Sequence, residues 1–220
     1  MPRPPGHGPE FDSRREQIID QAAALFATRG YAATGTADLC REVGLGKGAF
    51  YHYIDSKETL LVEIQNRVLG PLLEEAERLA LLDQPALVRL RLLSQHLLDV
   101  IFSRLEHIWV YEHDYRHLSK ENRQRVLEQR HQFERQVTAF LQDAITSGQI
   151  EDADARLLML QFLNMHNHTY QWARPGSELD PDTLSATYFA TLMGGFGAKP
   201  TAIRRAESAA RQVLVSERIA

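Results

Sequence analysis

The sequence contains a single cysteine and no long hydrophobic run in its 220 residues. The lone Cys40 excludes an intramolecular disulfide framework and any metal or iron–sulfur site that needs several cysteines of one chain. No stretch approaches the roughly 18 apolar residues that span a membrane, and the opening residues lack the apolar core of a signal peptide. We therefore expect a cytoplasmic protein without a membrane partner.

Sequence motifs of catalysis are missing as well. The chain has no Gly-x-Ser-x-Gly elbow, no glycine-rich phosphate loop and no cysteine–histidine pair at a catalytic spacing. We therefore expect that the protein is not an enzyme and needs no cofactor. Positive charge is not in excess either, since 25 Lys+Arg stand against 29 Asp+Glu and the formal net charge is -4. The total charge gives no indication of nucleic-acid binding.

The chain is instead rich in helical periodicity. Apolar residues recur every three or four positions along most of its length, and no stretch alternates with the two-residue period of a strand. The sequence therefore predicts an all-α fold. We expect a proline-rich flexible arm over 1–11, a first helix that starts near Ser13, and a kink or break at Gly70-Pro71. A long helix is predicted after Ser119, and two further helices are predicted over about 153–173 and 181–196.

Residues 34–54 form the clearest local pattern, in which two short helical segments are joined by a glycine-bounded turn. Gly44 can adopt the left-handed conformation that closes the first segment. The second segment concentrates hydrogen-bond donors and aromatic rings within two turns, at Lys47, Tyr51, His52 and Tyr53. This arrangement predicts a helix–turn–helix, whose second helix enters the major groove of DNA.

The same region resembles a known family. It contains, in order and spacing, the stretches Arg29-Gly30-Tyr31, Thr34, Gly44-Leu45-Gly46-Lys47-Gly48-Ala49-Phe50-Tyr51-His52-Tyr53 and Ser56-Lys57-Glu58-Thr59-Leu60. Residues 12–62 thereby resemble the DNA-binding domain of TetR-family transcriptional regulators. The resemblance implies an N-terminal three-helix helix–turn–helix domain over 12–62, a larger helical ligand-binding and dimerisation domain over 63–200, and a C-terminal tail or short helix over 201–220.

The resemblance also implies roles for individual residues. Thr34 would cap the second helix against a DNA phosphate, Tyr51 and Lys57 would contact other phosphates, and His52 would reach a base edge. The expected DNA-binding residues are Thr34, Thr36, Lys47, Gly48, Ala49, Tyr51, His52, Tyr53 and Lys57. Residues 1–57 carry equal numbers of basic and acidic side chains. We therefore expect affinity for operator DNA to depend on a few placed cations and on a homodimer that reads two half-sites.

Two later segments indicate an effector site. Aromatic and polar residues cluster over 109–117, and the helix predicted over 153–173 has apolar residues on two faces, interrupted by histidines and asparagines. Together with the stretches 172–176 and 188–196, the cluster over 109–117 resembles a subset of TetR regulators that control fatty-acid or steroid catabolism and respond to acyl-CoA thioesters. The resemblance implies a repressor that such an effector releases from DNA. The expected effector-binding residues are Trp109, His113, Arg116, His117, Phe162, Met165, His168 and Trp172.

Three alternatives remain open at this point. The polar residues of the helix over 153–173 fit a dimer interface equally well, because the last two long helices of two subunits form a four-helix bundle in this family. A second alternative is a metal-responsive regulator, since His113 and His117 stand four residues apart and could chelate zinc or nickel from one helix face. A helical adaptor without DNA-binding activity is indicated only by the balanced charge of residues 1–57.

Overall fold

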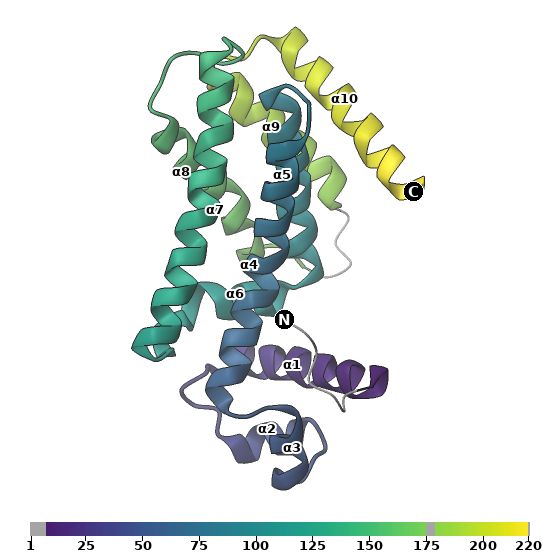
Figure 1. Ribbon diagram of the computed structural model, residues 1–220, viewed down its shortest axis with the longest axis vertical. Helices are drawn as coiled ribbons and strands as arrows, with labels where there is room; N and C mark the ends of the chain where they lie inside the picture. The colour runs from purple at the N-terminus through teal and green to yellow at the C-terminus, as the bar shows by residue number, and fades with distance from the viewer. Residues whose placement is uncertain (1–7, 175–178, 220) are drawn as a thin grey trace. The chain divides into compact units, whose positions relative to one another are not determined.

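A computed structural model describes residues 8–174 and 179–219. These residues fold into helices and contain no β-strand, which confirms the predicted all-α class (Figure 1). None of the described helices is long and apolar enough to cross a membrane. The elements in chain order are α1 Pro9–Arg29, α2 Thr36–Glu42, α3 Lys47–Tyr53, α4 Lys57–Leu81, α5 Ala86–Ser103, α6 Leu105–His113, η1 Tyr115–His117, α7 Lys120–Thr146, α8 Ala155–Asn167, η2 His168–Gln171, α9 Pro181–Gly195 and α10 Pro200–Ile219.

The helices form two compact units. The first unit combines Met1–Leu69 with Arg104–Leu127, and the second combines Gly70–Ser103 with Glu128–Ala220. The chain thus divides differently from the ranges 12–62 and 63–200, because α6, η1 and the start of α7 belong to the same unit as α1–α3. Sequence patterns follow the chain, whereas a compact unit is defined by contacts in space.

The first helix begins earlier than its predicted start near Ser13. Gly8 is the N-cap of α1 and Pro9 is its first helical residue, a position that tolerates proline because its N–H would have no helical partner. The flexible arm predicted over 1–11 is therefore helical from Pro9 onward, and residues 1–7 lie outside the described residues. Phe11 contributes to this start, because its ring stacks on Tyr53 at 4.7 Å between centroids.

The break predicted at Gly70-Pro71 does not occur, because α4 continues through both residues. Proline in a helix interior removes one backbone hydrogen bond and crowds the carbonyl four residues earlier. Here the surrounding turns are held by buried apolar side chains, which offset that cost: Val68, Leu69, Leu72 and Leu73.

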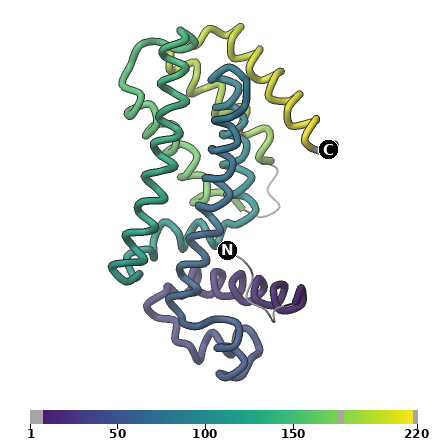
Figure 2. The backbone as a smooth tube through the Cα atoms, viewed as in Figure 1, coloured from purple at the N-terminus to yellow at the C-terminus, as the bar shows by residue number. Residues whose placement is uncertain are grey.

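The C-terminal residues form a long helix, where a tail or short helix was predicted over 201–220. Figure 2 traces the chain as it reverses between α9 and α10. Gly197 makes this reversal with a φ of 81°, and a Cβ at this position would collide with the side chain of Glu151. The Glu151 N–H donates to the Phe196 carbonyl at 2.9 Å, which closes the turn. The position therefore requires glycine.

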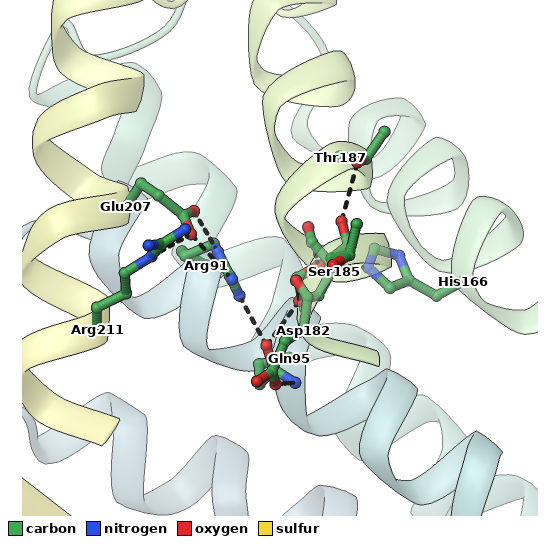
Figure 3. Close-up of polar contacts among 10 residues, drawn as sticks. Arg91, Gln95, His166, Asp182, Ser185, Thr187, Glu207 and Arg211 are labelled. Carbon is green, nitrogen blue, oxygen red and sulfur yellow. Dashed lines mark hydrogen bonds and ion pairs between the residues drawn. The ribbon is translucent and has the colours of Figure 1, made fainter. Parts of the chain in front are cut away.

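A buried hydrogen-bond network joins α5, α9 and α10 in the second unit (Figure 3). Arg91, whose side chain is 3% exposed, holds the Glu207 carboxylate with two nitrogens of its guanidinium group. Its third nitrogen donates to the Gln95 carbonyl at 3.3 Å, and the Gln95 amide donates to Asp182 at 2.7 Å. The Ser185 hydroxyl also donates to Gln95, at 2.7 Å. Since each buried polar group has partners, the network stabilises the position of α10.

His166 lies beside this network, fully buried in α8. Its Nδ1 is 2.7 Å from the Phe162 carbonyl, which can only accept, so Nδ1 carries the proton. The Ser94 hydroxyl then donates to Nε2 at 2.7 Å. Burial lowers the pKa of His166 to about 4, against the opposing effect of the Phe162 hydrogen bond. The histidine is therefore neutral, and its hydrogen bonds are satisfied within the chain.

The neutral state of His166 makes stability depend on pH. The pKa of His166 is lowered to about 4 in the folded protein, while an unfolded histidine titrates near pH ~6.5, so the unfolded chain binds the proton first as the pH falls. We expect this residue to lower the free energy of unfolding by roughly 2 kcal/mol between pH 7 and pH 5. His166→Asn should remove that part of the pH dependence, as measured by urea unfolding at both pH values.

The control for this measurement is His131→Asn, because His131 is exposed on α7. This variant should keep the pH dependence of the wild type. A pH dependence that is identical in His166→Asn and the wild type would contradict the expectation.

Candidate DNA interface and effector site

Helix α3 buries one side and exposes the other. Phe50 is 0% exposed and packs in the core of the first unit, together with Ile54 immediately after the helix. The opposite side presents Lys47, Gly48, Ala49, Tyr51 and His52, all of which are exposed. The sequence of α3 contains no acidic residue. The exposed face therefore offers a cation, a phenol and an imidazole without a carboxylate beside them on the helix.

The turn before α3 has the geometry that its glycines predict. Gly44 has a φ of 67°, in the left-handed region, and the Leu45 N–H donates to the Cys40 carbonyl at 2.9 Å. This bond satisfies a carbonyl at the end of α2, as in a Schellman-type helix end. The tight turn places α2 and α3 in contact, which is the local geometry of a helix–turn–helix.

The role predicted for Thr34 needs a correction. Gly35, and not Thr34, is the N-cap of α2. The Asp38 carboxylate accepts the Gly35 N–H at 3.0 Å, and this hydrogen bond lowers the pKa of Asp38. Thr34 is 1% exposed and its hydroxyl donates to the Gly30 carbonyl at 2.9 Å, so the side chain stabilises the loop between α1 and α2. Thr36, the first residue of α2, is half-buried.

Lys57 begins α4 and its ammonium group lies against the loop residue Tyr31. The Lys57 Nζ donates to the Tyr31 carbonyl at 2.5 Å and lies 3.9 Å from the centroid of the Tyr31 ring. Burial lowers the pKa of Lys57, while the charge of Asp114 opposes the shift. To contact a phosphate, this lysine must share or exchange its hydrogen bond to Tyr31.

Asp114 connects the end of α6 with the same loop. It is the C-cap of α6, is 6% exposed, and accepts a hydrogen bond from the Tyr31 backbone N–H. Burial raises the pKa of Asp114, while that hydrogen bond, the nearby histidines His117 and His113, and Lys57 act against the shift. The His117 ring stacks on the Tyr31 ring at 5.4 Å. A residue predicted to bind DNA and one predicted to bind the effector thus contact the same tyrosine.

The predicted effector-binding residues divide between the two units. Trp109, His113, Arg116 and His117 belong to the first, and Phe162, Met165, His168 and Trp172 to the second. In the first unit, Trp109 is half-buried and its ring stacks on His113 at 4.3 Å. In the second unit, Phe162 is fully buried, Met165 is half-buried, and His168 and Trp172 are exposed. Phe162 therefore belongs to the core.

The metal-binding alternative finds no support in the geometry. Helix α6 ends at His113, and His117 lies in the separate 3-10 helix η1, so the two histidines do not share a helix face. The Nδ1 of His113 is 2.8 Å from the Trp109 carbonyl. Across residues 8–174 and 179–219, no group of three or more potential ligands is placed to hold a metal ion.

Two residues near the interface were not among the expected site residues. Asp114 falls within the polar and aromatic cluster over 109–117, but its contact with Tyr31 could not be predicted because it joins positions distant in the sequence. Glu58 matched the family pattern without an assigned role; its carboxylate accepts from the Asn122 amide at 2.6 Å and from the Ser119 N–H at 2.9 Å. These hydrogen bonds lower the pKa of Glu58 and fix the start of α7 against α4 within the first unit.

Comparison with known proteins gives matches along most of the chain. Residues 18–64 match the family model described as bacterial regulatory proteins, tetR family, and residues 83–196 match that described as tetracyclin repressor-like, C-terminal domain. The HTH-type transcriptional repressor KstR2 of Mycobacterium tuberculosis is 28% identical over 192 residues, which cover 84% of this chain and 94% of that protein.

Solved structures agree with this similarity. The ketosteroid transcriptional regulator KstR2 of M. tuberculosis has a TM-score of 0.80 and 25% identity, over 86% of this chain and 97% of that chain. The TetR-family regulator PfmR of Thermus thermophilus has a TM-score of 0.75 and 27% identity, over 83% of this chain and 99% of that chain. AibR, solved with isovaleryl coenzyme A and operator DNA, shares the fold with a TM-score of 0.72 and 22% identity, over 82% of this chain and 98% of that chain.

Proposed function

The chain belongs to the TetR family of bacterial regulatory proteins, and we propose that it represses transcription as a homodimer that a small hydrophobic effector, such as an acyl-CoA thioester, releases from operator DNA. The observation that carries the proposal is the exposed face of α3, which joins Lys47, Tyr51 and His52 without a carboxylate on the helix. Such a face suits the major groove, where phosphates surround the base edges.

The nine predicted DNA-binding residues fall into two groups. Lys47, Gly48, Ala49, Tyr51 and His52 are exposed on α3 and are assigned direct contact with DNA. The others act from the supporting structure: Thr34, Thr36, Tyr53 and Lys57, of which Lys57 is also assigned a phosphate contact, made when it exchanges its hydrogen bond to Tyr31. Tyr53 stacks on Phe11 and Lys57 lies on Tyr31, so these two side chains fix the orientation of α3 and the start of α4. Contacts with phosphates set the register of the protein on DNA, and base contacts supply specificity.

A second copy of the chain is proposed to cover the outer face of α8. Leu157 is 56% exposed and Leu160 is 43% exposed, while Phe162 on the inner face is buried. His168 and the 44% exposed Trp172 follow in η2 and directly after it. Exposed apolar residues grouped on one helix mark an interaction surface. We therefore assign His168 to the dimer interface, the alternative that the sequence left open for the polar residues of this helix, and we assign Trp172 to it as well. A two-fold dimer matches an operator with two half-sites.

Effector binding is proposed to act on DNA binding through the contacts of Tyr31. Trp109, His113, Arg116 and His117 lie in or beside α6, and His117 stacks on the tyrosine that holds Lys57. A ligand that prefers a conformation with altered Tyr31 contacts lowers DNA affinity. The size of the effect is the difference between the ligand's binding free energies for that conformation and for the DNA-binding one, typically about 1–3 kcal/mol. The acyl-CoA class is supported by AibR, which was solved with isovaleryl coenzyme A.

The DNA contacts can be tested by substitution. We expect Tyr51→Phe combined with Lys57→Ala to weaken binding roughly tenfold or more to operator and unrelated DNA alike, because both lose phosphate contacts. The slope of log affinity against log salt should also decrease, as measured by fluorescence anisotropy. His52→Ala should weaken operator binding only. Lys120→Ala, which removes the same charge from the exposed start of α7, serves as the control and should bind as the wild type does. Unchanged affinity and salt slope in the double variant would refute the assignment.

The effector class can be tested with a series of acyl-CoA thioesters of increasing chain length. Thioesters that bind the native state should raise the thermal midpoint, with about 2.7 kcal/mol of stabilisation at a hundredfold excess over Kd. The same thioesters should release operator DNA with a preference for one chain length, while free coenzyme A should do neither. A flat response across the whole series would exclude this effector class and leave the DNA-binding proposal intact.

The dimer surface can be tested with one charged substitution. Leu157→Glu places a carboxylate on the outer face of α8, so we expect monomers in analytical ultracentrifugation and a loss of operator binding. Leu81→Glu is the matched control, because Leu81 is 89% exposed at the end of α4 and also belongs to the second unit. Dimers that persist in Leu157→Glu would place the interface elsewhere.

A further inference from the structure

We infer that Gln65 recognises the polar part of the effector, and that this part is a neutral group able both to donate and to accept a hydrogen bond, such as a hydroxyl or an amide on an otherwise apolar molecule. The inference rests on the effector binding proposed above. It adds to that proposal a recognition residue and a chemical requirement for the ligand.

The environment of the Gln65 side chain carries the inference. Gln65 lies in α4 and is 0% exposed. Neither its Nε2 nor its Oε1 has a hydrogen-bond partner, and among the described residues it is the one side chain with two such buried atoms. Buried polar groups in native proteins nearly always have partners, so an amide with neither bond made calls for an explanation.

The neighbours of Gln65 along α4 are apolar. Leu61 and Leu69, four residues before and after it, share its helix face and belong to the core of the first unit. Trp109, a predicted effector-binding residue, and Tyr111 pack against the same core. Gln65 therefore interrupts an apolar stripe within the core that the effector-related aromatic residues also join. A leucine at this position would continue the stripe without the desolvation cost of an unpaired amide.

Gln95 is a second buried glutamine, and its hydrogen bonds serve the structure of the second unit. It is 3% exposed in the second unit, and its Oε1 accepts from Ser185 and Arg91. Its Nε2 donates to Asp182 and Asp99. Both polar atoms of Gln95 are thus satisfied inside the protein. The contrast separates Gln65 from the structural network and assigns its hydrogen bonds to a ligand.

The amide defines which ligand group fits. Its nitrogen donates and its oxygen accepts, so a partner that does both satisfies each atom. A saturated acyl chain offers neither function, and a thioester carbonyl only accepts. A hydroxyl on the acyl chain, or an amide of the pantetheine arm, meets the full requirement. A site built to pair with such a group discriminates strongly against an analogue that lacks it.

The test compares Gln65→Leu with the matched variant Gln95→Leu. Gln65→Leu should raise the thermal midpoint of the ligand-free protein, because it removes two unpaired polar atoms from an apolar core. Gln95→Leu should lower the midpoint, because it removes the Gln95 hydrogen bond to the Asp182 carboxylate and one of the acceptors of Arg91. A lower midpoint in Gln65→Leu would show that the amide has partners within the protein and would overturn the inference.

The ligand arm uses a 3-hydroxyacyl-CoA, the parent acyl-CoA of equal length, and the hydroxy fatty acid without coenzyme A. If the hydroxyl is recognised, the wild type should prefer the hydroxylated thioester to its parent at least tenfold, and the hydroxy fatty acid should bind as well. If the pantetheine amide is recognised, both thioesters should bind equally and the fatty acid should not. Gln65→Leu should lose at least tenfold in affinity for the recognised probe.

Equal affinity of Gln65→Leu and the wild type for every bound probe would overturn the inference while leaving effector binding in place. A wild type that binds none of the three probes would instead refute the acyl-CoA part of the proposed function. The thermal midpoints of the two leucine variants would then decide the inference about Gln65 by themselves.

Discussion

The first unit depends on the contacts of one loop residue, Tyr31. Its carbonyl accepts a hydrogen bond from Lys57 at the start of α4, and its backbone N–H donates to Asp114 at the end of α6. Its ring lies between those of His117 and Phe26, at 5.4 and 5.1 Å. Helices α1, α4 and α6, which are distant from one another in the sequence, therefore meet at one residue. Asp114 and His117 therefore contact the same residue that holds the Lys57 ammonium group.

Ion pairs within the first unit explain how a chain with an acidic total can present a face suited to DNA. Several acidic residues of the N-terminal region are paired within the first unit: Arg67 binds Glu16 and Asp20, and Arg41 binds Asp38 at 3.2 Å. Helix α3 has no acidic residue of its own, and its cation is exposed. A protein with a net charge of -4 can therefore present a face suited to DNA, because local placement and not the total decides the potential at a phosphate.

The predictions that succeeded concern features encoded by neighbouring residues. The helix–turn–helix around Gly44 and the long helix after Ser119 follow from turn chemistry and helical periodicity, and both appear in the structure. Predictions that needed knowledge of neighbours in space were less successful. Thr34 is a buried loop residue, α4 passes through Pro71 unbroken, and His113 and His117 lie in different helices. The sequence did not single out Gln65, because a glutamine is common in helices and its lack of hydrogen-bond partners is visible only in the folded protein.

The sequence by itself determined the all-helical class, the DNA-binding motif and the family, because each depends on residue spacings along the chain that can be recognised without knowing the fold. Only the tertiary structure decided which polar residues are satisfied inside the protein and which are not. His166, Gln95 and Gln65 are all buried polar residues on helices, yet the first two have partners and the third has none. The difference arises from side chains that lie far away in the sequence, and a hydrogen bond exists only where folding brings its donor and acceptor together.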